Sequence, residues 1–93
     1  MTSREYPIKT ARRTGLLTVT EHADRIVLRL TFDRYGTLGD EAEIARQLAP
    51  LLAPFDRDPR PLDFESPDTG QRAAIDFDEA GRPVAVVTSE PLQ

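Results

Sequence analysis

The sequence predicts an α+β domain in which one helix packs on one face of a four-stranded, mainly antiparallel sheet, in the order β-β-α-β-β. Two patterns predict this fold: residues 25–33 alternate between apolar and polar side chains, and residues 40–53 repeat apolar residues at helical spacing. Alternation with a period of two is typical of a strand with one buried face, whereas spacings of three and four indicate an amphipathic helix. The chain of 93 residues has the length of a single domain, which we place at residues 14–88.

The first thirteen residues show no periodic pattern and contain Pro7. They carry four cations against one acid, a charge of +3, while residues 14–93 carry −7, which together give the net charge of −4. We interpret residues 1–13 as a flexible basic tail, with a short extended segment around residues 6–8 as an alternative, and residues 89–93 as a C-terminal tail. An acidic body repels phosphate backbones, so we expect no nucleic-acid partner.

Residues 16–20 alternate and include β-branched side chains, which predicts a strand beside residues 25–33. We expect the two strands to pair antiparallel, with Leu17 opposite Leu28. The tightest turn in that register would be His-Ala, which lacks the glycine or asparagine that two-residue hairpin turns favour. We therefore expect a wider loop over residues 21–24.

The helix is predicted by its start and by its apolar stripe. Asp40 suits the N-cap, and Glu43 three residues later completes the spacing of a capping box. The apolar residues that share one face are Ile44, Leu48, Leu51 and Leu52. Pro50 lacks an N–H group and crowds the preceding turn, so we expect a regular helix from Glu41 to about Ala49, followed by a kinked or 3₁₀ turn.

The C-terminal part begins with residues 54–70, which contain four prolines and five acids and read as a connecting loop. A structureless loop of that length is unusual in a compact domain, so a short strand at residues 61–65 is an alternative. Residues 73–77 and 84–88 form the last predicted hairpin, around a type I turn at residues 78–81 that ends in glycine.

Catalytic chemistry finds little support in the sequence. The chain has no cysteine and one histidine, His22, which falls in a turn. No residues have the spacing of a metal site, a phosphate-binding loop or a nucleophile elbow, so we predict no catalytic, cofactor-binding or metal-binding residues. The longest uncharged run, residues 47–55, is far shorter than the about 18 residues that span a bilayer, so we expect no membrane partner and a cytoplasmic location.

Surface residues are the better candidates for function. Arg25 and Arg29 share the outer face of the central strand, where guanidinium groups match carboxylates or phosphates. The outer face of the last hairpin is apolar at Val84 and Val86, which favours a protein partner or a second copy of the chain. The candidate interaction residues are Arg25, Arg29, Val84, Val86, Asp76 and Asp78.

Three classes of function follow from these features. The first is a small non-catalytic protein-interaction or accessory domain that self-associates through a sheet face or edge. The second is an acidic inhibitor or immunity-type protein that neutralises a basic partner. Its contact residues would be Asp56, Asp58, Asp63, Asp76, Asp78 and Glu79. The third is a small enzyme or ligand carrier.

A local resemblance also bears on assembly. Residues 15–20, residues 25–32 and the acidic-capped helix after them resemble the strand-strand-helix part of the YbaB/EbfC-like family of nucleoid-associated proteins. The likeness covers about residues 15–53, rests on a generic motif and implies a dimer. The chain lacks the long N-terminal helix of that family, adds a C-terminal hairpin and has an acidic body, so we do not assign it to the family.

Overall fold

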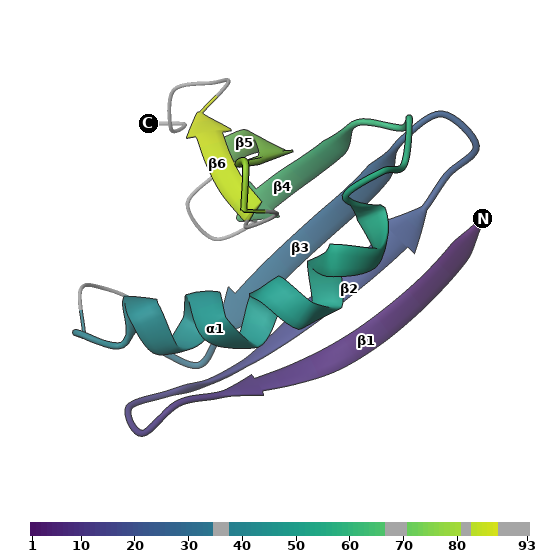
Figure 1. Cartoon of the computed structure of the whole chain (residues 1–93). Helices are drawn as coiled ribbons and strands as arrows, with labels where there is room; N and C mark the ends of the chain where they lie inside the picture. Colours follow the sequence, from purple (N-terminus) through teal and green to yellow (C-terminus); the bar gives the residue numbers. More distant parts are fainter. Residues whose placement is uncertain (35–37, 67–70, 81–82, 88–93) are drawn as a thin grey trace.

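The computed structural model describes residues 1–34, 38–66, 71–80 and 83–87, with the backbone alone for β5 and β6 (Figure 1). The described elements form a single sheet of six strands in the order β1-β2-β3-β4-β5-β6. The strands are β1 (Thr2–Lys9), β2 (Thr14–Glu21), β3 (Ile26–Phe32), β4 (Leu62–Ser66), β5 (Gln71–Phe77) and β6 (Pro83–Val87). Neighbouring strands pair antiparallel except β3 and β4, which are parallel.

One helix, α1 (Glu41–Leu52), connects the two parallel strands and lies across one face of the sheet over β2 and β3 (Figure 1). Its apolar stripe and the inward side chains of the first four strands form the core. The buried core residues are Ile8, Leu17, Val19, Ile26, Leu28, Leu30, Ile44, Leu52 and Leu62. The predicted α+β class, the mainly antiparallel sheet and the helix on one face are therefore confirmed.

Two strands join the four that were predicted. Residues 2–9 form β1 rather than part of a flexible tail, and Ile8 in this strand is only 1% exposed. The strand forms because Tyr6 and Ile8 project to the helix side of the sheet and pack against the core. The second additional strand, β4, confirms the alternative of a short strand within the proline-rich segment.

The register of β2 and β3 differs by two residues from the prediction. Leu17 lies opposite Leu30, and the connection narrows to residues 23–24, where the His22 N–H donates a hydrogen bond of 2.8 Å to the Arg25 carbonyl. A shift of two residues preserves the inward and outward faces of both strands, so the predicted core side chains are still buried.

The α-helix continues through Pro50 to Leu52, beyond the predicted end at Ala49, and the 3₁₀ turn η1 (Ala53–Phe55) follows it. Pro50 is exposed, so its ring projects into solvent instead of disturbing the packed face. The buried Leu52 in the turn after it gives a physical reason for the continuation, because an ended helix would withdraw this side chain from the core.

Candidate functional site

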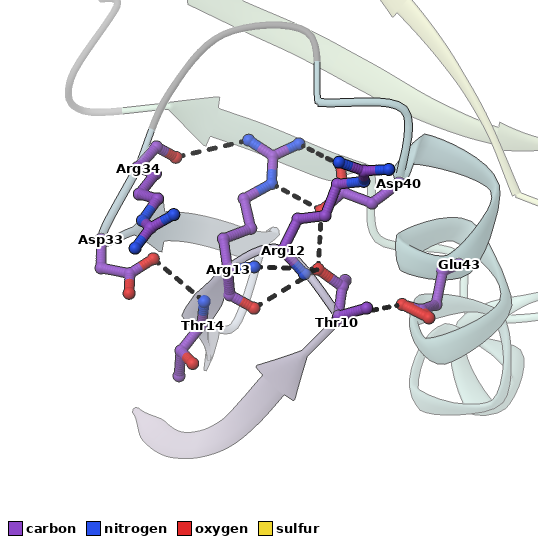
Figure 2. A network of polar contacts seen from close by, with 9 residues as sticks. Thr10, Arg12, Arg13, Thr14, Asp33, Arg34, Asp40 and Glu43 are labelled. Carbon is purple, nitrogen blue, oxygen red and sulfur yellow. Dashed lines mark hydrogen bonds and ion pairs between the residues drawn. The ribbon is translucent and has the colours of Figure 1, made fainter.

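A buried polar cluster lies where the β1–β2 loop, the end of β3 and the start of α1 meet (Figure 2). The Arg13 guanidinium donates from Nε and Nη2 to the two carboxylate oxygens of Asp40, at 2.9 Å each. The Thr10 hydroxyl donates to Asp40 Oδ2 at 2.7 Å and accepts the N–H groups of Arg12 and Arg13 at 3.1 Å. The Arg13 guanidinium carbon also lies 4.4 Å from the centre of the Phe32 ring.

These bonds fill both oxygens of the Asp40 carboxylate. The hydrogen bonds from Arg13 are the largest influence on the pKa of Asp40 and lower it below 3.8, although burial acts in the opposite direction. A bidentate pair of this kind is strong and directional, which suits it to fixing two segments at one distance. We therefore interpret the cluster as a structural tie between the hairpin and the helix rather than as a substrate site.

The same cluster corrects the predicted capping box. Asp40 is at the N-cap, but its side chain forms no capping hydrogen bond, because the carboxylate is turned toward Arg13 and Thr10. The Glu43 carboxylate accepts the backbone N–H of Ala11 at 3.3 Å instead of reaching back along the helix. Both acidic residues thus hold the β1–β2 loop against the first turn of α1 (Figure 2).

A second polar cluster, centred on Arg60, holds the connection between β2 and β3. Its Nε and Nη2 atoms donate to the two carboxylate oxygens of Asp58 at 2.9 and 2.6 Å. The remaining bonds run to Glu21 Oε1, at 2.9 Å, and to the His22 carbonyl, at 3.0 Å. The side-chain hydrogen bonds from Arg60 lower the pKa of Asp58 from 3.8 to about 2. This guanidinium satisfies the carbonyl of His22 beside the turn, and the turn residues need neither glycine nor asparagine because none of them has a positive φ.

The predicted arginine pair is only partly brought together. Arg29 lies in β3 with its side chain 54% exposed, and its Nε is 3.8 Å from Glu65 Oε2. Arg25 is exposed and precedes β3. Four residues of extended chain separate the two by about 13 Å. That is a separation of the backbone, and Arg29 is the member of the pair that lies near a carboxylate, Glu65, so a shared anion site at Arg25 and Arg29 stays a prediction.

The other predicted interaction residues belong to the second hairpin. The Asp78 carboxylate accepts the N–H of Ala80 at 2.9 Å, which is a turn-stabilising bond. The side chains of Asp76, Val84 and Val86 lie outside the described part of the structure, so their proposed role stays a prediction. Of the acids in the inhibitor hypothesis, Asp58 forms an ion pair with Arg60 of its own chain.

The surface that the fold leaves open is the face of β1, β2 and β3 opposite the helix. Because Ile8, Leu17 and Leu28 project toward α1, the alternating residues of the three strands project to the other side. We call this surface the open sheet face. Its residues are Ser3, Glu5, Pro7, Leu16, Thr18, Thr20, Val27, Arg29 and Thr31, of which Val27 is buried. Leu16 is 37% exposed, which makes it the exposed large apolar side chain of this face.

The free edge of β1, by contrast, is closed to another strand along part of its length. Thr10 donates to the Arg13 carbonyl, so the pairing pattern directs the backbone groups of the odd-numbered residues of β1 away from β2. At Lys9 these groups bind the Gln47 side chain of α1, at 3.1 Å for the N–H and 2.6 Å for the carbonyl. Pro7 has no N–H to offer. The second half of the β1 edge therefore offers few free backbone groups, which favours the open sheet face over this edge as a binding surface.

Sequence reasoning missed the part of this surface that lies on β1. The prediction places Glu5 in a tail, and Pro7 in that tail or in the alternative extended segment of residues 6–8, because charged and proline residues interrupt the apolar alternation there. The available signal was the pair Tyr6 and Ile8, whose spacing of two marks an inward face.

The comparisons with known proteins add no assignment: no protein-family model, curated protein or solved structure matches this chain. In the described part of the chain, no three or more histidine, cysteine or acidic residues gather as a metal site would require. No helix among the described residues has the length and hydrophobicity needed to cross a membrane.

Proposed function

We propose that this chain is a small, non-catalytic protein-binding domain that associates with a second copy of itself through the open sheet face. The observation that carries the proposal is the exposure of Leu16 on the open sheet face, among the mainly polar side chains of three strands. Sheets pack face to face when such surfaces meet, and the apolar contact supplies the driving force. The buried charged groups of the described residues, Arg13 and Asp40, pair with each other and so offer no competing site.

The open sheet face is a better binding surface here than the edge of β1. Strand addition needs a row of free N–H and C=O groups. In the described structure, Gln47 occupies both backbone groups of Lys9, and Pro7 has no N–H, so half of β1 offers few free groups to a partner. The helix does not cover the open sheet face, because α1 lies on the opposite side of the sheet (Figure 1).

The proposal is tested by measuring molecular mass over a dilution series. We expect static light scattering to report a dimer at high concentration and a monomer on dilution, and we expect Leu16→Glu to remain monomeric throughout. Ala45→Glu is the matched control, because it adds the same charge on an exposed position of α1 away from the open sheet face. A wild-type chain that stays monomeric at millimolar concentration would contradict the proposal, as would equal effects of the two variants.

A further inference from the structure

The charged residues of the open sheet face are arranged in a pattern that a second copy could match. Thr18 of β2 lies between Glu5 of β1 and Arg29 of β3, and the three form one row across the strands. The neighbouring row contains Leu16, flanked by Pro7 and Thr31. Opposite charges therefore lie symmetrically on the two sides of β2, in the row next to the apolar side chain.

We infer that the two copies are related by a two-fold axis that runs along β2, between the two sheets, so that Glu5 of each copy faces Arg29 of the other. This inference rests on the proposed function. A two-fold rotation about that axis exchanges β1 and β3 but keeps each row at its own level along the strand. It therefore places Leu16 on Leu16, Thr18 on Thr18, and two opposite-charge pairs beside them.

The geometry of sheet packing is compatible with these contacts. Packed sheets are about 10 Å apart, a distance that the side chains of two facing surfaces fill. Neighbouring strands are about 4.8 Å apart, so Glu5 and Arg29 each lie only about 5 Å from the axis. Aligned sheets cross at about 30°, which would displace Glu5 of one copy from Arg29 of the other by about 2 to 3 Å along the strands. A long arginine side chain can span that displacement. Arg29 would then lie between Glu65 of its own chain and Glu5 of the other.

The arrangement can be tested with two single charge reversals, Glu5→Arg and Arg29→Glu. Each homodimer would contain two like-charge pairs, so we expect each variant alone to associate at least tenfold more weakly than wild type. A mixture of the two variants would instead restore both opposite-charge pairs in the heterodimer. We therefore expect the equimolar mixture to dimerise within about threefold of the wild-type dissociation constant, measured by sedimentation equilibrium. The exposed positions of both residues make retention of the fold straightforward to confirm by circular dichroism.

The outcomes separate this inference from the proposal on which it rests. If wild type dimerises and Leu16→Glu does not, but the mixed variants fail to associate, the open sheet face is the interface and the two-fold arrangement is wrong. If wild type does not dimerise, both fail. Recovery in the mixture alone, with neither variant dimerising by itself, is the result that this arrangement requires.

Discussion

At the scale of single residues, charged side chains in this protein connect segments that are distant in the sequence. Asp40 and Glu43 have the spacing of a capping box, yet both bind the loop between β1 and β2. A carboxylate that accepts two hydrogen bonds from one guanidinium gains more than it would from a single backbone N–H. The Asp40 carboxylate therefore binds Arg13 instead of capping the helix. No local pattern could predict this pairing, because the two residues are 27 positions apart.

The ion pair between Asp58 and Arg60 should make stability depend on pH in the acid range. The pKa of Asp58 is lowered from 3.8 to about 2 in the folded chain. A lowered folded-state pKa contributes stability above the unfolded pKa, and that contribution is lost as the pH falls toward the folded value. We expect the difference in unfolding free energy between wild type and Asp58→Asn to be constant above about pH 5 and to shrink between about pH 4 and 2, as measured by urea denaturation.

The exposed neighbour Asp56 provides the control for this experiment. Asp56→Asn keeps the Arg60 cluster intact and should follow the wild-type pH profile. An Asp58→Asn difference that persists unchanged down to about pH 2 would show that the ion pair is not its source.

Gly15 should not tolerate a side chain. A Cβ at this position would lie 2.4 Å from Phe32 Cδ1 and 2.6 Å from the carbonyl oxygen of Thr31, both far inside van der Waals contact. We expect Gly15→Ala to lower the free energy of unfolding by about 1–3 kcal/mol, the usual range for overpacking, measured by urea denaturation. The double variant with Phe32→Leu should lose less than the sum of the single losses, because the ring clash is removed. An unchanged midpoint for Gly15→Ala would refute the close packing of Phe32 over Gly15.

At the scale of elements, the sequence predicted what local periodicity determines and missed what distant contacts determine. The central strand, its partner and α1 have clear periods of two and 3.6, and the structure confirms them. The predicted register of β2 and β3 was wrong because it was judged from the turn residues alone. Arg60, which binds the turn, lies 38 residues beyond His22. Only part of the open sheet face could be predicted. The sequence placed Arg29 on the outer face of a strand, but it predicted no strand that contains Glu5.

The closure of the β1 edge by α1 leads to a prediction for Gln47. Its side chain bonds both backbone groups of Lys9. We expect Gln47→Ala to lower the free energy of unfolding by about 1 kcal/mol and to speed hydrogen exchange at the Lys9 amide, measured by NMR. The matched control is Arg46→Ala, on the exposed neighbouring position of α1, which should leave this amide unchanged. Equal exchange of the Lys9 amide in the wild type and the Gln47 variant would show that the edge is not protected in this way.

At the scale of the whole molecule, two electrostatic effects oppose each other on self-association. Each chain carries a net charge of −4, so two copies repel at long range. The inferred pairs between Glu5 and Arg29 attract at short range, but such exposed pairs are usually worth under about 1 kcal/mol each. The apolar contact at Leu16 does not depend on charge and must therefore supply much of the affinity.

This balance predicts a weak dependence of dimerisation on salt. Added salt screens the repulsion between the two acidic chains and weakens the exposed ion pairs as well, because the Debye length falls to a few ångströms near 1 M. The two changes have opposite signs, so we expect the dissociation constant to vary by less than about tenfold between about 0.05 and 0.5 M NaCl, measured by sedimentation equilibrium. An acidic inhibitor bound to a basic partner would instead associate much more slowly at high salt. A steep loss of self-association over this range would mean that charge pairs dominate the interface and that Leu16 is not its centre.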